Sequence, residues 1–367
     1  MQIKAAVLRK YNQPLAVEDI ELAPPKEKEV LVRTAYTGLC HSDLSMAKGN
    51  FKCPLPLVIG HEAAGVVEAV GRGVTSLKAG DHVVTTWAIA CGECPECRRG
   101  ERYLCRTNLE IQMAGGLLDK TSRLSDVKGR RLNHHLLVSG FAEYMVVPEA
   151  GTFAVDKNIP LDQVSLIGCC FPTGFGAVYN AAGVRPGETV AIWGMGGVGL
   201  NVVYGAKVRG ADPIIAVDLE GSKEEIAREF GATHFINSSK DDPVPIIQEL
   251  TGGGALYCFE VAGDPGAQLQ AYWALGLGGK LMTVGVPMEG DMTQLPLTFN
   301  PPQCKSIIGT VYGNIHTERD IPVLAKMISK GNFQLEKLVT KKFKIWEIND
   351  ALEAMERREI VGRWVCE

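Results

Sequence analysis

The chain has 367 residues, of which 38 are basic and 42 are acidic, so its formal net charge is −4. This balance shows no basic excess that would suit nucleic acid or an anionic membrane surface, and we expect a small-molecule partner. At about 150 residues per domain, the length predicts two domains with sizeable cores.

The chain starts with a strand-like alternation, MQIKAAVLRK, which lacks the long apolar core of a secretion signal. No apolar run of about 18 residues, the length needed to span a bilayer, follows it. We therefore expect a cytoplasmic protein without a membrane partner. Eleven cysteines in such a chain favour metal binding or catalysis over disulfides.

Three short motifs interrupt the apolar runs: GLCHSD at 38–43, GHE at 60–62 and GCC at 168–170. They contain three candidate metal ligands: Cys40, His61 and Cys169. Spacing alone cannot join these residues into one site. Taken singly, a buried cysteine or a hydrogen-bonded histidine is the better interpretation.

The strongest metal motif is CGECPEC at 91–97, followed by one more cysteine, which gives four sulfurs separated by two, two and seven residues. Such a set suits tetrahedral zinc with no open position, because the glycine, proline and charged residues between the sulfurs offer little core of their own. We predict a structural zinc with four ligands: Cys91, Cys94, Cys97 and Cys105. Iron–sulfur clusters are usually spaced differently, and four reduced surface thiols would be prone to oxidation.

His134 and His135 are adjacent, and neighbouring residues of a strand point to opposite faces, so we assign them a structural role rather than a shared metal. Four further cysteines have no partner spacing and are expected to be apolar fillers or exposed thiols: Cys53, Cys258, Cys304 and Cys366. Neither set enters the predicted sites.

The run Thr189–Trp193 is apolar, as in a buried parallel strand, and glycines 194, 196 and 199 follow it as G-x-G-x-x-G. Gly194 permits the tight turn, Gly196 lets the backbone approach a pyrophosphate, and Gly199 lets the next helix lie close to the strand. A second apolar run ends in Asp218, whose carboxylate can bind a ribose diol and would repel a 2′-phosphate. The segment therefore predicts a dinucleotide site that favours NAD over NADP.

Strand-like runs at 257–261, 280–286 and 306–311 continue the alternation of strands and helices. Alternation of this kind is typical of an α/β unit with a parallel sheet. We therefore expect a doubly wound sheet over this part of the chain.

Together these motifs make the chain similar to the zinc-dependent alcohol dehydrogenases of the medium-chain dehydrogenase/reductase superfamily, over essentially its whole length. The similarity rests on GLCHSD, GHE, the four-cysteine segment, Gly168-Cys169 with Thr173-Gly174, and the glycine fingerprint, all in the family's order. The resemblance implies an α/β protein in which a GroES-like β-rich catalytic domain accompanies a Rossmann domain. It implies a catalytic domain at 1–170 and 312–367, with a zinc lobe at 91–105, and an NAD-binding domain at 171–311.

The resemblance also implies a catalytic zinc with one open position, and thus two zinc ions per chain. The three protein ligands of this zinc would be Cys40, His61 and Cys169. Asp43 matches the carboxylate that orients the ligand histidine, and Glu62 matches an acidic neighbour of the metal. Ser42 matches the hydroxyl that hydrogen-bonds the substrate oxygen.

For the cofactor, the resemblance implies four residues that line the nicotinamide: Thr173, Val198, Val284 and Val286. Within the fingerprint, Gly197 belongs to the same turn as Gly194, Gly196 and Gly199. Three further residues match polar contacts to the pyrophosphate or ribose: His41, Lys223 and Arg363. For these three, a solvated surface charge is the alternative interpretation.

The implied reaction interconverts an alcohol and its aldehyde or ketone, with zinc as the Lewis acid and hydride passing to NAD. A glutathione-dependent formaldehyde dehydrogenase is a nearby alternative, but it would carry an arginine where this chain has Leu109. An inactive zinc- and nucleotide-binding protein is a distant alternative, which the complete ligand set disfavours. The substrate is not readable from the sequence, and Trp87 is the one pocket wall that we place.

One position departs from the family pattern. In many members a histidine three residues beyond the serine that corresponds to Ser42 ends a proton relay, whereas this chain has Ser45 there. A serine hydroxyl passes on a hydrogen bond but does not hold a proton near neutral pH. We expect the relay to end in water, in another base or in His41. The long connection at 105–140 resembles that of dimeric members and favours a homodimer.

Overall fold

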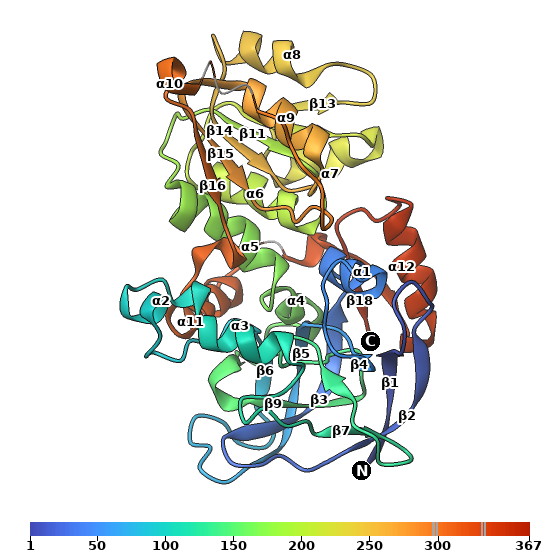
Figure 1. Ribbon diagram of the computed structural model, residues 1–367. Helices are drawn as coiled ribbons and strands as arrows, with labels where there is room; N and C mark the ends of the chain where they lie inside the picture. The colour runs from blue at the N-terminus through green and yellow to red at the C-terminus, as the bar shows by residue number, and fades with distance from the viewer. Residues whose placement is uncertain (296–297, 299, 332, 334) are drawn as a thin grey trace. The chain divides into compact units, whose positions relative to one another are not determined.

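The computed structural model describes residues 1–295, 298, 300–331, 333 and 335–367. The chain forms two compact units, one of Met1–Cys170 with His316–Glu367 and the other of Phe171–Ile315, whose elements are labelled in Figure 1. Among the described residues, no helix has the length and apolar character needed to cross a bilayer.

The first unit is built on two sheets, most of whose strand pairs are antiparallel. One sheet has the order β7 (Leu124–Asp126), β2 (Ala16–Leu22), β1 (Gln2–Leu8), β4 (Leu57–Val58) and β8 (Asn133–His134). The other has the order β10 (Thr152–Ala154), β6 (His82–Thr85), β5 (Glu62–Val70), β3 (Glu29–Gly38), β18 (Arg363–Cys366) and β17 (Val339–Phe343), and β9 (Tyr144–Pro148) pairs with β3. These sheets confirm the predicted GroES-like β-rich part of the fold.

Strand β1 contributes side chains to two separate buried clusters of the first unit. Ile3, Ala5 and Val7 belong to one buried cluster, while Ala6 and Leu8 belong to another. Successive side chains of a strand point to opposite faces, so this run of apolar residues is buried on both sides.

Most helices of the first unit have fewer than ten residues. The helices are α1 (His41–Lys48), α2 (Pro95–Arg98), α3 (Arg106–Met113), α4 (Leu161–Leu166), α11 (Thr317–Ser329) and α12 (Ile348–Glu356). The C-terminal strand of this unit returns to β3, which leads into the GLCHSD motif. In the register of β18 with β3, Val365 lies opposite Gly38. The last residues of the chain therefore lie beside the first candidate metal ligand.

The second unit contains a six-stranded, all-parallel sheet. Its order is β13 (His234–Asn237), β12 (Ile214–Asp218), β11 (Val190–Trp193), β14 (Ala255–Glu260), β15 (Leu275–Thr283) and β16 (Ser306–Gly309). This order, with strands numbered from β11, is that of the doubly wound dinucleotide-binding fold, so the Rossmann prediction is confirmed. Each apolar run that we expected to be a strand is one.

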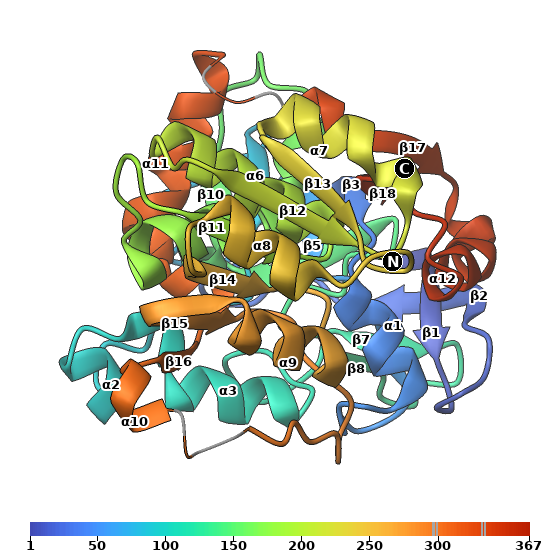
Figure 2. The same ribbon diagram turned by 90° about the horizontal axis from the view of Figure 1, so that it is seen from above.

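Helices cover both faces of this parallel sheet. On one face lie α6 (Gly197–Val208) and α7 (Glu224–Phe230), and on the other lie α8 (Pro243–Leu250) and α9 (Pro265–Trp273) (Figure 2). Ala191 and Trp193 of β11 belong to one cluster with Ile247 of α8 and Ala271 of α9. The fully buried Val190 alternates with them and points to the α6 face.

The junction near residue 312 lies slightly later than the resemblance implied, because the second unit ends at Ile315 rather than at 311. The turn at Tyr312–Asn314 packs against Ala177–Ala182, the segment that follows α5 (Cys170–Gly176). Asn180 Nδ2 donates to the Gly313 carbonyl oxygen at 3.2 Å. A Cβ at Gly313 would lie 2.3 Å from the carbonyl oxygen of Pro172, so only glycine permits this approach. These contacts attach residues 312–315 to the second unit.

Candidate active site and metal sites

The two strand ends that carry the first candidate ligands are neighbours. In the antiparallel pair β3 and β5, Gly38 lies opposite Glu62, so Cys40, two residues beyond β3, and His61, directly before β5, meet at one end of the sheet. Cys169 lies directly before α5, and its sulfur lies within 4.8 Å of the ligand atoms of the other two residues. The fold thus joins three buried side chains that spacing alone could not join.

Asp43 holds two members of this set. Its Oδ1 lies 3.1 Å from His61 Nδ1, and its Oδ2 accepts a hydrogen bond from the Cys40 backbone amide at 3.0 Å. Burial by itself would lower the pKa of His61, but the Asp43 carboxylate raises it well above its usual value. A proton kept on Nδ1 leaves the Nε2 lone pair for a metal.

The donor set fits zinc, since two sulfurs and one imidazole nitrogen are ligands that zinc prefers. The Cys169 thiol hydrogen-bonds Cys40, which lowers the pKa of Cys40 well below its ordinary value, while the same contact raises that of Cys169. The neighbouring Cys170 does not join them. Its sulfur instead lies 3.8 Å from the Leu166 carbonyl oxygen, and it is not among the side chains that converge with Cys40 and His61.

Glu62 and Arg363 form a buried ion pair, with 3.1 Å between Glu62 Oε2 and Arg363 Nη2. Arg363 Nη1 also donates to the Leu39 carbonyl oxygen at 2.9 Å. Burial raises the pKa of Glu62 to about 7, against the lowering effect of Arg363. Gly38 makes room for this carboxylate, because a Cβ there would lie 2.7 Å from Glu62 Cδ.

Arg363 is therefore not the solvated surface charge considered as an alternative, since only 5% of it is exposed. Arg363 is the first residue of β18, and the pairing of this strand with β3 brings it beside Leu39. One feature of the sequence agrees with this burial: the arginine lies within an apolar run, VGRWVC. Its contact with a cofactor stays a prediction.

The remaining residues of GLCHSD lie in the first turns of α1. His41 is exposed, Ser42 is half-buried, and Ser45 is buried one turn further along the helix. Ser42 and Ser45 are three positions apart, so they lie on the same side of α1. This spacing suits a path of hydroxyl groups along one helix face.

Sequence reasoning missed the contact between Asp43 and His135. His135 Nδ1 lies 3.6 Å from Asp43 Oδ1, and the rings of His61 and His135 meet edge to face with 5.3 Å between their centroids. His134 instead accepts a hydrogen bond from the Arg123 amide at 3.2 Å. The two histidines have different environments, as alternation along a strand predicts, and burial lowers the pKa of His135 to about 4.

The four cysteines of the lobe also converge, with all sulfurs within 4.8 Å of one another. The sulfurs of Cys94 and Cys105 are 4.0 Å apart, close to the about 3.8 Å that tetrahedral zinc–sulfur bonds of about 2.3 Å imply. The Cys94 amide donates to the Cys91 sulfur at 3.3 Å. Thr107 and nearby amides lower the pKa of Cys91 to about 6. The geometry fits a structural zinc.

In the second unit, the glycine fingerprint forms the turn between β11 and α6. Gly194 has a φ of +97°, and a Cβ on Gly199 would lie 1.8 Å from the Gly194 carbonyl oxygen. Apart from Gly196 itself and its two neighbours in the chain, no described residue has an atom within 4 Å of a Cβ added there. This open side, at the start of the 12-residue helix α6, fits the close approach of a phosphate group.

Asp218 ends β12 and lies beside that turn. Its Oδ2 accepts from the Met195 amide at 2.6 Å and lies 3.2 Å from Lys223 Nζ, while its Oδ1 accepts from the Glu220 amide at 2.9 Å. Lys223 is only 9% exposed, so it too is not a solvated surface charge. These three donors of the described chain leave one of the about four acceptor positions of the carboxylate open.

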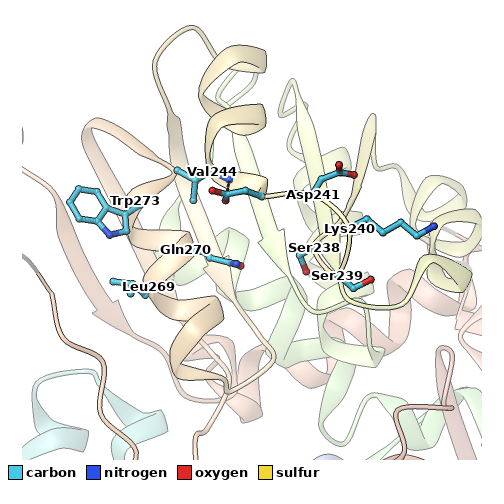
Figure 3. A pocket seen from close by; sticks show the side chains of 9 residues that line it. Ser238, Ser239, Lys240, Asp241, Val244, Leu269, Gln270 and Trp273 are labelled. Carbon is cyan, nitrogen blue, oxygen red and sulfur yellow. Dashed lines mark hydrogen bonds between the residues drawn. The ribbon is translucent and has the colours of Figure 1, made fainter.

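The other predicted cofactor residues are spread over the second unit. Thr173, Val198 and Val284 are half-buried, and Val286 is exposed. A hollow of about 480 Å³ lies elsewhere, between the β13–α8 connection and α9, and none of the predicted residues lines it (Figure 3). Gln270 links this hollow to β11, because its Oε1 accepts from Trp193 Nε1 at 3.2 Å.

Comparison with known proteins agrees with these features. Residues 26–157 match the family described as alcohol dehydrogenase GroES-like domain, and residues 197–330 match zinc-binding dehydrogenase. The chain is 38% identical to alcohol dehydrogenase 1 of Trifolium repens over 368 residues, which cover 98% of this chain and 96% of that protein.

Two solved structures are similar over 100% of this chain and 99% of their own. An alcohol dehydrogenase zinc-binding domain protein from Burkholderia ambifaria has a TM-score of 0.93 at 37% identity. Benzyl alcohol dehydrogenase from Acinetobacter calcoaceticus has a TM-score of 0.92 at 35% identity. On this similarity of sequence and structure, the chain belongs to the zinc-dependent medium-chain alcohol dehydrogenase family and is an oxidoreductase.

Proposed function

We propose that the chain interconverts an alcohol and its aldehyde or ketone by hydride transfer to and from NAD, with two zinc ions per chain. The observation that carries this proposal is the convergence of Cys40, His61 and Cys169, with Asp43 orienting the histidine. Zinc bound by these three side chains supplies Lewis acidity toward the substrate oxygen.

The protein's own groups orient the reactants and move the proton. Asp43 keeps the Cys40 amide and the His61 ring in place through hydrogen bonds of 3.0 and 3.1 Å. We assign to Ser42 the hydrogen bond to the substrate hydroxyl, from which the proton departs. Ser45 continues the path on the same helix face, and water beside it takes the proton, because a serine hydroxyl cannot hold it.

For the dinucleotide, we propose that the α6 turn holds the pyrophosphate and that Asp218 accepts a ribose hydroxyl. When bound, NAD supplies the hydride acceptor. A 2′-phosphate would meet the Asp218 carboxylate at close range, so we expect a preference for NAD over NADP of at least ~10-fold in kcat/KM. The open side of Gly196 supports this placement of the phosphates.

The test is a screen of NAD reduction with aliphatic, aromatic and cyclic alcohols, together with aldehydes and ketones in the presence of NADH. Benzyl alcohol is the first aromatic candidate, because a structural relative is described as a benzyl alcohol dehydrogenase. We expect at least one alcohol class to reduce NAD. Absence of turnover with all classes, in protein containing two zinc ions, would contradict the proposal.

A glutathione-dependent formaldehyde dehydrogenase remains the nearest alternative. The position that would carry its carboxylate-binding arginine is Leu109, which is 57% exposed and uncharged. We therefore expect the glutathione adduct of formaldehyde to be a poorer substrate than simple alcohols. A strong preference for that adduct would favour the alternative.

We further propose a homodimer in the cytoplasm. None of the eleven cysteines is paired in a disulfide, which suits a reducing compartment. Strand β16 ends the parallel sheet and pairs with β15 alone among the described strands, while Ile307 on it is 47% exposed. An apolar edge of this kind suits pairing with a second copy of the chain.

A further inference from the structure

We infer that Asn108 and Gln112 of helix α3 are positioning residues that set substrate selectivity by clamping the backbone of Trp87. The inference rests on the proposed function in one respect, that Trp87 is a wall of the substrate site. It adds to that function two residues that act on the substrate site through the backbone of Trp87.

Trp87 follows β6, which pairs with β5, the strand that begins directly after the ligand histidine. The last pair in this antiparallel register is Ala64 with Val84, and the Thr85 hydroxyl continues it by donating to the Ala63 carbonyl oxygen at 3.0 Å. Trp87 lies two residues beyond the end of β6, at a bend of the chain. The direction of the indole therefore depends on how the backbone is held at position 87.

Both amides donate to that backbone. Asn108 Nδ2 donates to the Trp87 carbonyl oxygen at 3.0 Å, and Gln112 Nε2 donates to the same oxygen at 2.5 Å. The two donors are four positions apart on α3 and lie on one face of the helix. A carbonyl oxygen has two lone pairs, and the clamp uses both. The orientation of this peptide is therefore fixed from one side.

The clamp is anchored in the four-cysteine lobe. Cys105 is the N-cap of α3, and its sulfur accepts from the Asn108 amide at 3.5 Å and from the Cys91 amide at 3.3 Å. Cys91 follows Trp87 by only four residues, so the lobe holds both the tryptophan segment and the helix that clamps it. A predicted structural zinc site thereby acquires a role in shaping the substrate site.

The pattern of burial along α3 indicates that the amides have a specific task. Asn108 and Gln112 are 7% and 3% exposed, whereas Leu109 and Met113 of the same helix are 57% and 44% exposed. A surface helix usually turns its apolar residues inward and its polar residues outward. Here two amides occupy buried positions that leucine or methionine would otherwise fill.

The test compares Gln112→Met and Asn108→Leu, singly and combined, with the wild type. These changes keep side-chain volume and remove the donors. We expect the ratio of kcat/KM for benzyl alcohol to kcat/KM for ethanol to change by about tenfold in the double variant, through KM more than kcat, because two modest hydrogen bonds are lost. Glu110→Leu, an exposed polar-to-apolar change on the same helix, is the matched control and should leave the ratio unchanged.

A second arm removes the indole. In a Trp87→Ala background, Gln112→Met should change the ratio no further, because the clamp acts through that side chain. Equal effects with and without the indole would show general destabilisation and would overturn the inference. The zinc content and the melting temperature of each variant are measured, and only variants with two zinc ions per chain are compared. If a variant does not fold, Gln112→Asn replaces it, because this change shortens the side chain by one methylene and moves the donor away from the Trp87 carbonyl oxygen.

Tryptophan emission separates this inference from the proposed function. The fluorescence spectrum of each protein minus that of the same protein carrying Trp87→Phe gives the contribution of Trp87 without that of the other tryptophans. We expect Gln112→Met to shift that difference spectrum whether or not the protein oxidises alcohols. A shifted spectrum in a protein that oxidises no alcohol would refute the proposed function and leave the clamp supported. An unchanged spectrum, or an unchanged selectivity ratio in an active enzyme, would overturn the clamp.

Discussion

Cys169 and Cys170 are adjacent, yet the structure groups only Cys169 with Cys40 and His61. We predict that Cys169→Ala lowers the zinc content from two ions per chain to one and abolishes alcohol oxidation, because the remaining ligands bind the metal too weakly. Cys170→Ala, which removes a sulfur of the same size one residue away, is the control and should keep both ions. Elemental analysis showing loss of zinc from Cys170→Ala alone would reverse the assignment.

Ser45 is the residue at which the chain departs from its family. We predict that Ser45→His raises alcohol oxidation at pH 7 by about 10- to 100-fold, as expected of a positioned base. An imidazole with a pKa near ~6.5 is unprotonated above that value and can take the proton, whereas at pH 10 hydroxide serves both proteins and the gain disappears. Pre-steady-state hydride transfer measured from pH 6 to 10 provides the check. Overlapping profiles would mean that Ser45 does not interrupt the relay.

At the scale of single residues, the sequence predicted which side chains form the candidate metal site better than it predicted the ion pairs and hydrogen bonds around them. The resemblance supplied Cys40, His61 and Cys169, and the structure brings them together. It did not supply the ion pair of Arg363 with Glu62, because the two residues are about 300 positions apart and meet only through the pairing of β18 with β3. Contacts of this kind depend on non-local pairing, which residue spacing does not encode.

The turn between β11 and α6 offers a matched pair of glycine variants. Gly196→Ala places its methyl group in open space, so we predict a melting temperature close to that of the wild type and an about tenfold or larger increase in the Kd for NADH. Gly199→Ala would bring a Cβ to 1.8 Å from the Gly194 carbonyl oxygen, so we predict a lower melting temperature. Thermal unfolding and NADH fluorescence titration test both, and unchanged NADH binding in Gly196→Ala would place the phosphates elsewhere.

Secondary-structure elements were predictable where local pattern determines them. Apolar runs bounded by glycine and charge identified β11, β12 and the three later strands of the parallel sheet, because such strands are buried on both faces. For the β-rich unit, the resemblance implied only its GroES-like class, and its strand pairing was not predicted. Strands β4 and β8 have two residues each, which is too short to produce a recognisable pattern in the sequence.

For the molecule as a whole, we predict a homodimer of about 79 kDa, twice the 39.6 kDa of one chain. Ile307 lies on the edge strand β16 and is 47% exposed, so Ile307→Lys should shift the assembly toward monomer by placing a charge on an apolar edge. Lys280→Arg, on the neighbouring strand β15, retains its charge and is the control. Light scattering that shows a tetramer, or a dimer that Ile307→Lys leaves intact, would contradict this assignment of the interface.

The central claim is that the buried ligand set of Cys40, His61 and Cys169 makes this chain an NAD-dependent alcohol oxidoreductase. The most direct measurement is alcohol-dependent NADH formation by the wild type and by Cys40→Ser, at equal protein concentration and with the zinc content of both determined. We predict turnover with at least one alcohol class and a preference for NAD over NADP in the wild type, together with loss of one zinc ion and of turnover in Cys40→Ser. Equal rates in the two proteins, or turnover that persists after that zinc ion is lost, would contradict the claim.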